Sequence, residues 1–154
     1  MGTFWLQDAS LLHKVREAIL NAYGLQYVIP HRKVYASHSR AKIRRLVKKD
    51  LLCNLLSEVG FDIVYFANLL FQKQVKLVVE IVILMGAHGV KLINMLFMLS
   101  QGKFLELING GNRNLASYKL STYGNVEYYC LPCQSMGIVA INDSDISVDT
   151  HEFG

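Results

Sequence analysis

An uninterrupted apolar run at residues 81–85 ends at a Gly-Ala-His-Gly turn at 86–89, and a second apolar segment then continues to Phe97. The run has the length of a strand that is buried on both faces, and the segment after the glycines has helical spacing. A strand followed directly by a helix leaves unpaired backbone N–H groups and a helix N-terminus at one point. This arrangement is typical of an anion-binding turn in an α/β protein.

The same alternation of short apolar runs with helical patterns extends over most of the chain. Gly24 and Gly60 stand where the first two helices are expected to end. Helices are predicted at 10–20, 51–59, 72–80, 89–97 and 114–123, and strands at 33–37, 61–66, 81–85, 104–108 and 126–131. Strands that alternate with helices in this way form right-handed βαβ units and a parallel sheet. We therefore expect an α/β fold, a Rossmann-like three-layer domain with a mostly parallel sheet.

The length of 154 residues fits one domain, and apolar residues make up 52% of the chain, which favours strands buried on both faces. The strand and helix pattern stops near residue 135. Residues 142–154 hold four acids and no Lys or Arg. We expect a Rossmann-like domain at 1–135 and a loose C-terminal extension at 136–154.

Basic residues are concentrated in the first third of the chain, where eight of the sixteen Lys and Arg lie between Arg32 and Lys49. This concentration indicates an anionic partner. Binding of single-stranded nucleic acid requires aromatic side chains between the basic ones, and Tyr35 alone lies there. We therefore expect no nucleic-acid partner.

The three cysteines form no disulfide framework, which suits a reducing compartment and predicts a cytoplasmic protein. Cys130 and Cys133 have the spacing of half a zinc site, but two further ligands at the usual spacing are missing. We interpret them as half-buried thiols at a strand end and expect no metal and no cofactor. No signal peptide is evident. The apolar stretch 77–99 carries charges and glycines that disfavour a membrane span, although its basic neighbour leaves peripheral membrane association open.

The candidate site lies where two strands end, because ligands of parallel sheets bind beyond the carboxyl ends of the strands, at the point where strand order reverses. Ser37 and His38 follow one strand, and the 86–89 turn follows another. Gly86 is expected to let the chain turn sharply, and Gly89 to let a phosphate approach the backbone. His88 can donate a hydrogen bond to a phosphate oxygen or a sugar hydroxyl. The alternative is an exposed turn histidine between two structural glycines.

Arg44 and Arg45 border the same site if these two strands are neighbours, and guanidinium groups make bidentate contacts with phosphate. The alternative is a solvated helix face. Glu106, at the end of strand 104–108, is the acid expected at the ligand edge, although a helix-capping or solvent-facing role is equally open. The sequence contains no recognisable catalytic triad, Walker loop or dinucleotide fingerprint, so no catalytic residue is assigned.

Several segments, in unbroken order from about residue 33 to residue 134, resemble the motifs of glycosyltransferase family 61. The segment G-A-H-G-V-K-L-I-N-M-L-F at 86–97 is similar to the family's G-P-H-G-A-G-L-T-N-x-x-F, and F-L-E at 104–106 to its (V/I)-(I/L)-E. Residues 34–45 resemble its Y-I-S-R-x-x-A-x-x-R-R segment. Residues 69–77, with Phe71, Gln74 and Val75, resemble its L-S-F-x-E-Q-V-x-L helix, and Tyr128-Tyr129 its closing strand.

The resemblance implies an inverting enzyme that transfers a sugar from a nucleotide-sugar donor to a glycan or other hydroxyl acceptor, as in polysaccharide biosynthesis. It implies the C-terminal, donor-binding half of a GT-B architecture, most of whose N-terminal acceptor domain is missing here. Asn94 is expected on the first turns of the helix, holding the motif loop in shape. The donor-binding residues are then Gly86, His88, Gly89, Asn94, Ser37, His38, Arg44, Arg45 and Glu106. The general base stays unassigned.

The chain also departs from the family pattern. Lys91 replaces a glycine where the family keeps close backbone approach, and Leu70 replaces the helix-opening Ser, an N-cap that contributes about 1 kcal/mol. The other departures are His38 for Arg, Ile93 for Thr, Lys48-Lys49 for Asn-Glu and Leu99-Ser100 for Pro-Pro. The alternative hypothesis is therefore a catalytically inactive remnant, or a partner-binding α/β domain.

Overall fold

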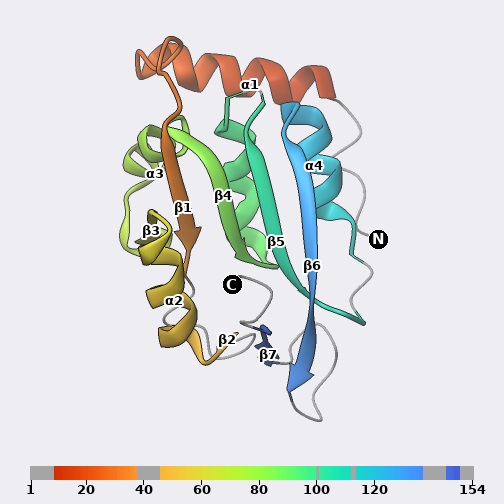
Figure 1. Ribbon diagram of the computed structural model, residues 1–154. Helices are drawn as coiled ribbons and strands as arrows, with labels where there is room; N and C mark the ends of the chain where they lie inside the picture. Colours follow the sequence, from red (N-terminus) through yellow and green to blue (C-terminus); the bar gives the residue numbers. More distant parts are fainter. Residues whose placement is uncertain (1–8, 38–45, 100, 112–113, 137–144, 150–154) are drawn as a thin grey trace.

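The computed structural model describes residues 9–37, 46–99, 101–111, 114–136 and 145–149, without the side chains of 90–93. Its strands form one sheet in the order β2-β7-β6-β5-β4-β1-β3 (Figure 1). Five consecutive strands of this order are β6 (Glu127–Met136), β5 (Lys103–Asn109), β4 (Ile81–Ala87), β1 (Arg32–Ala36) and β3 (Phe61–Val64), the last of which is an edge strand. All neighbours among these five are parallel. The predicted α/β fold with a mostly parallel sheet is confirmed.

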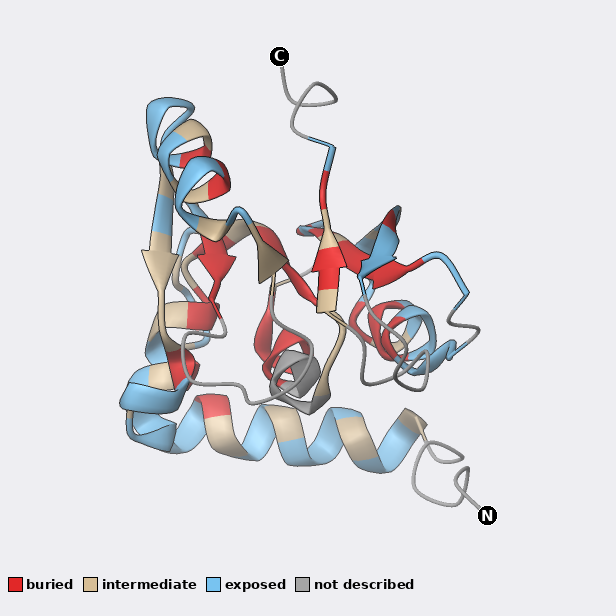
Figure 2. Cartoon of the chain, turned by 90° about the horizontal axis from the view of Figure 1, so that it is seen from below, coloured by how far each residue is buried: buried red, intermediate tan, exposed pale blue. Residues whose placement is uncertain are grey.

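Helices cover the two faces of the sheet unequally. One face carries α1 (Ala9–Ala22), α3 (Phe71–Val78), the 3₁₀ helix η3 (Val90–Phe97) and α4 (Ala116–Gly124), whereas α2 (Lys49–Glu58) lies on the other (Figure 2). A short 3₁₀ turn, η2 (Phe66–Asn68), precedes α3. Gly24 and Gly60 end α1 and α2 with φ of 66° and 84°, the left-handed conformation predicted for them.

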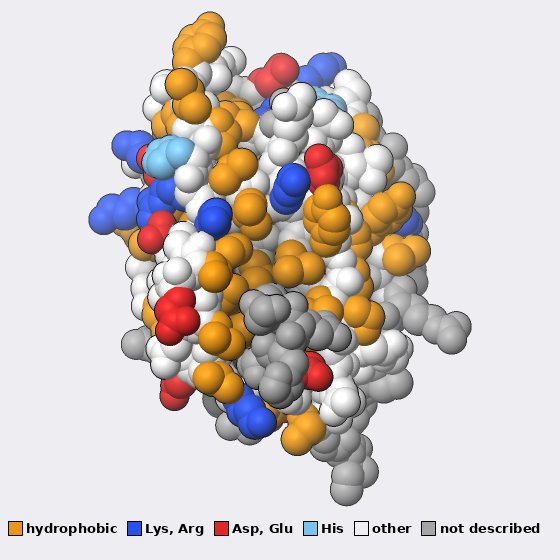
Figure 3. Space-filling model, in the orientation of Figure 1, with side chains coloured by type: hydrophobic (Ala, Val, Ile, Leu, Met, Phe, Trp, Pro, Cys, Tyr) orange, Lys and Arg blue, Asp and Glu red, His pale blue; other side chains and the backbone are white. Residues whose placement is uncertain are grey.

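Two hydrophobic clusters form the core, one on each side of the sheet. Side chains alternate between the faces of a strand, so Val34 and Ala36 of β1 join the cluster under α1, α3, η3 and α4, while Tyr35 joins the cluster under α2. The face that carries α2 is only partly covered, and Figure 3 shows hydrophobic side chains across its middle. Among them, Leu105 is half-buried and Tyr129 is 48% exposed.

Two short strands were not predicted from the sequence: β2 (Leu46–Val47), at the edge of the sheet, and β7 (Asp145–Ser147), between β2 and β6. β7 pairs antiparallel with β6 and parallel with β2. Part of the expected loose extension therefore adds a strand to the sheet. Ile146 and Val148 explain why, since both are buried against the cluster on the α2 side. Three residues of alternating pattern are too short a signal to stand out in a sequence.

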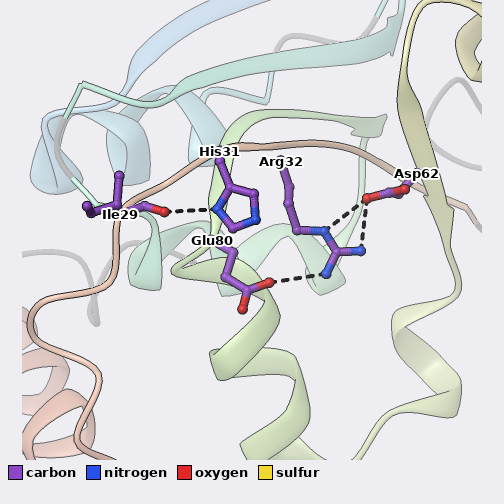
Figure 4. A network of polar contacts seen from close by, with 5 residues as sticks. All are labelled: Ile29, His31, Arg32, Asp62 and Glu80. Carbon is purple, nitrogen blue, oxygen red and sulfur yellow. Dashed lines mark hydrogen bonds and ion pairs between the residues drawn. The ribbon is translucent and has the colours of Figure 1, made fainter.

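An ion-pair network ties β1 to its neighbours at the amino ends of the strands (Figure 4). The guanidinium of Arg32 donates to Asp62 Oδ2 from Nε at 2.9 Å and to Glu80 Oε2 from Nη1 at 3.2 Å. The backbone N–H groups of His31 and Arg32 both donate to the Glu80 carbonyl, at 2.8 and 2.9 Å. Arg32 is therefore paired with two carboxylates, and it lies at the end of the sheet opposite the expected ligand edge.

The apolar stretch 77–99, which we considered as a membrane span, is divided between several secondary-structure elements. Residues 81–87 form β4, which pairs on both sides within the sheet. Among the described residues, no helix has both the length and the apolar character that crossing a bilayer requires.

Candidate functional site

The strand order reverses between β1 and β4. From β1 the chain proceeds to β3 on one side, and it then returns to place β4 on the other side of β1. Ala36 of β1 pairs with Gly86 of β4, so the carboxyl ends of these strands lie side by side (Figure 1). The two strands are therefore neighbours, which meets the condition of the site hypothesis, and Ser37 and His88 follow them at the switch point where such sheets bind ligands.

Gly86 does not act as predicted, whereas the approach of a phosphate to Gly89 stays a prediction. Gly86 lies within β4 and pairs with both Ala36 and Glu106, so the sharp turn expected there is wrong. Pairing with β5 extends the strand to Ala87, and the His88 N–H continues this ladder by donating to the Leu107 carbonyl at 2.9 Å. Gly89 has φ of 165°, an extended conformation, and the helix that follows it is 3₁₀.

His88 is oriented by a buried carboxylate. Its Nδ1 lies 2.5 Å from Oε1 of Glu106, which comes from the adjacent strand β5. The His88 side chain is 16% exposed, whereas the Glu106 side chain is fully buried. The histidine is thus the outer member of the pair. The alternative, an exposed turn histidine, is wrong.

Glu106 is held by two further hydroxyl groups. Ser117 Oγ of α4 donates to its Oε1 at 2.7 Å, and the Tyr128 hydroxyl of β6 donates to its Oε2 at 2.6 Å. The helix-capping and solvent-facing alternatives for Glu106 are therefore wrong. Because Glu106 is fully buried, we expect it to influence a ligand at this edge through His88 rather than by direct contact.

Tyr128 stays protonated in this environment. Burial, and then the hydrogen bond to Glu106, raise the pKa of its phenol above the ordinary value of 10. Its ring contacts Tyr118 edge-on at a centroid distance of 5.6 Å and Phe104 in a tilted arrangement at 5.9 Å. These contacts fix the hydroxyl as a donor to the carboxylate.

Asn94 lies in η3, as expected, and its side-chain amide forms a hydrogen bond within the protein. Its Nδ2 donates to Oε1 of Gln74 at 2.6 Å, and Gln74 Nε2 donates in turn to the carbonyls of Phe66 and Leu69, both at 2.9 Å. Gln74 therefore joins η2, α3 and η3. Asn94 thus ties η3 to α3 and η2, and its expected role in shaping the motif loop stays a prediction.

Two buried polar atoms at the carboxyl edge have no hydrogen-bond partner among the described residues: Ser37 Oγ and Asn109 Nδ2. Ser37 follows β1, and its own backbone N–H donates to the Val64 carbonyl at 2.8 Å. Asn109 ends β5, and its Oδ1 accepts from the N–H of Gly111 at 3.1 Å. Each unpaired buried group costs about 1–3 kcal/mol, so a hydrogen bond from a ligand at this edge would be favourable.

The remaining predicted site residues, His38, Arg44 and Arg45, lie outside the described residues, as does the side chain of Lys91. Cys130 and Cys133 lie within β6, with Cys130 exposed and Cys133 buried. Residues three apart in a strand face opposite sides of the sheet, so these two thiols do not form one half of a zinc site. Our description of both as half-buried at a strand end is wrong.

Comparison with known protein families identifies the family of this chain. The family model described as Glycosyltransferase 61 matches residues 7–105. The chain belongs to this glycosyltransferase family. No curated protein matches the chain.

The match to glycosyltransferase family 61 spans α1 to the middle of β5, and so includes β1, β4 and the switch point between them. His88 lies inside the matched range. Glu106, Ser117 and Tyr128 lie beyond it, although they hold the His88 ring. The fold therefore links the matched motif to a part of the chain that the family match does not reach.

Sequence reasoning missed Ser117, Tyr128 and Asn109 as members of this site. The register of β5 and β6 supplies a signal for Tyr128. Phe104 pairs with Tyr128, and Glu106, two residues after Phe104, lies on the same face of the sheet, so the side chains of Tyr128 and Glu106 share that face. Ser117 has no such signal, since its position depends on how α4 packs. An amide ending a buried strand was the available signal for Asn109.

Proposed function

We propose that this chain binds a nucleotide-sugar donor at the carboxyl edge of β1 and β4 and transfers the sugar, with inversion, to a hydroxyl acceptor. The nucleotide diphosphate lies beside residues 86–89, and His88 contacts it. Ser37 supplies a hydroxyl, and we assign His38, Arg44 and Arg45, which follow β1 in the sequence, to contacts with the diphosphate. The domain corresponds to the donor-binding half of a GT-B enzyme.

The observation that carries this proposal is the position of His88 at the β1–β4 switch point, on a chain that belongs to a glycosyltransferase family. Parallel sheets bind nucleotides where strand order reverses. A histidine anchored at Nδ1 presents its second ring nitrogen to a ligand. Family membership supports a sugar-nucleotide rather than another phosphorylated ligand.

Transfer with inversion requires the acceptor oxygen to attack the anomeric carbon from the side opposite the phosphate. The bond from that carbon to the diphosphate oxygen breaks, and negative charge develops on the departing nucleoside diphosphate. Groups that donate hydrogen bonds to this charge accelerate the step. We assign this role to His88 and, from the family resemblance, to Arg44 and Arg45. The base that removes the acceptor proton is not assigned.

The test is titration calorimetry of the wild-type chain with UDP-, GDP- and CMP-sugars at millimolar concentration. We expect one nucleotide class to bind, and His88→Ala to weaken binding at least tenfold. His31→Ala is the matched control, because His31 lies at the opposite end of the sheet and contacts the Ile29 carbonyl. Binding in that variant should equal binding in the wild type.

Absence of heat with all three donor classes would refute the donor site. If a donor binds, NMR of the product made with a simple alcohol or glycan acceptor determines the anomeric configuration. A product that retains the donor's configuration would contradict the inverting mechanism. Binding without any transfer would favour the inactive remnant.

A further inference from the structure

We propose that Ser117 and Tyr128 are positioning residues for His88, acting through the Glu106 carboxylate so that Nε2 of the imidazole is presented to the donor. The inference rests on the proposed function for its ligand. Its geometry rests on contacts that bring together β4, β5, β6 and α4. Neither hydroxyl touches the donor in this arrangement.

In the part of the chain that the structure describes, Glu106 accepts three hydrogen bonds, and its side chain is fully buried. An ionised carboxylate offers about four acceptor sites and no donor. Ser117 shares Oε1 with His88, and Tyr128 holds Oε2. A rotation of the carboxylate that released His88 would break both hydroxyl contacts as well, so the two hydroxyls fix the plane in which the imidazole is bound.

The hydrogen-bond pattern also sets which ring nitrogen of His88 carries the proton. Because ionised Glu106 only accepts, Nδ1 must donate, and the neutral ring therefore has its lone pair on Nε2. Such a ring accepts a hydrogen bond from a sugar hydroxyl. After protonation the same Nε2 donates to a phosphate oxygen. The backbone N–H of His88 is fixed on Leu107, so the ring has one direction in which to present this nitrogen.

Removing one hydroxyl changes this pattern. Without Tyr128 or Ser117, the buried carboxylate loses a fixed partner and can rotate away from Nδ1. Once Nδ1 has lost its acceptor, the hydrogen of the neutral imidazole is no longer confined to Nδ1, and the ring is free to take the Nε2–H form by exchanging one proton with water. We therefore expect Tyr128→Phe and Ser117→Ala to convert His88 partly or wholly to the Nε2–H tautomer.

The first measurement needs no ligand. Long-range ¹H–¹⁵N correlation on protein labelled with ¹⁵N-histidine reports the tautomer of each histidine, with His88 identified by its loss in His88→Gln. We expect the Nδ1–H form in the wild type and a shift toward Nε2–H in both variants. An Nε2–H form in the wild type, or wild-type signals in both variants, would overturn the proposal.

Matched controls are available in the same two elements. Tyr129→Phe removes the neighbouring hydroxyl of β6, which donates to the exposed Glu127 at 2.7 Å. Ser121→Ala removes a buried hydroxyl one turn further along α4, which donates to the Tyr118 carbonyl at 2.6 Å. Both should leave the His88 tautomer unchanged. If the controls shift it as much as the test variants do, general loosening of the fold explains the effect and the proposal fails.

The second measurement is the affinity for the nucleotide sugar that the wild type binds. We expect Tyr128→Phe and Ser117→Ala each to weaken it by roughly five- to tenfold, comparable to the loss of one hydrogen bond. Equal affinity would overturn the positioning role. If the wild type binds no nucleotide sugar, the proposed function fails, while the tautomer measurement still decides whether the two hydroxyls orient His88.

Discussion

Leu70 occupies a helix-capping position with a side chain that cannot cap. It is the N-cap residue of α3, with φ of −65° and ψ of 151°, and it makes no side-chain hydrogen bond to the helix. This extended conformation is the one in which Ser accepts a hydrogen bond from the backbone N–H two or three residues later. Leu70→Ser should therefore restore a cap without changing the backbone.

Two opposing contributions determine the size of the effect. A new Ser cap contributes about 1 kcal/mol to the free energy of unfolding. Leu70 is 75% exposed, so the change gives up about a quarter of the roughly 1.5–3 kcal/mol that full burial of a leucine contributes. The net gain is about 0.5 kcal/mol. Adding Lys73→Glu completes a capping box and removes a cation from the helix N-terminus, for about 0.3–1 kcal/mol more.

Urea unfolding followed by far-UV circular dichroism measures this gain. For the double variant we expect the midpoint to rise by about 0.5 M at unchanged slope. Leu115→Ser is the matched control at the N-cap of α4, where ψ is 13° and Asn114 Oδ1 already accepts from the Ala116 N–H at 2.9 Å. It should give no gain. A midpoint for Leu70→Ser that equals or falls below that of the wild type would refute the capping argument.

Two further predictions concern stability. Gly102→Ala should destabilise the protein by about 1–3 kcal/mol, because the added Cβ would lie 2.7 Å from Cε of the buried Met98 and 3.3 Å from the Leu99 carbonyl. Urea unfolding measures this loss of stability, and a midpoint equal to that of the wild type would contradict the clash. Stability should also fall as the pH rises above about 10, because burial raises the pKa of the Tyr35 and Tyr128 phenols, which stay neutral when folded and ionise when unfolded. Urea midpoints between pH 9 and pH 11 test this, and Tyr128→Phe should show a smaller decrease than the wild type.

The central sheet could be predicted because its strands carry their own signals. Short runs with strand patterning located β1, β3, β4, β5 and β6, and their alternation with helices made them parallel by the right-handed crossover rule. The neighbourhood of β1 and β4 was a condition of the site hypothesis rather than a result of it. Strand order depends on packing across the whole domain, which local patterns do not encode.

The interior of the site could not be predicted in the same way. Glu106 at a strand end reads as a solvent-facing acid, because isolated carboxylates are rarely buried. Its burial depends on donors from three elements, and Ser117 reaches it only through the packing of α4. Gly86 was misjudged for a related reason: a glycine after an apolar run suggests a turn, but pairing with two neighbouring strands keeps the chain extended.

The buried carboxylate bears on what the site is for. Stability alone does not require it, since replacing a buried ionic group by well-packed apolar residues is often neutral or stabilising. Glu106 instead needs three donors from three other elements to be tolerated in the interior. One of those donors, His88, stands at the strand-order reversal, where a parallel sheet binds its ligand. A polar arrangement that is demanding to bury and ends at that point is better explained by the need to orient His88 than by the need to fold.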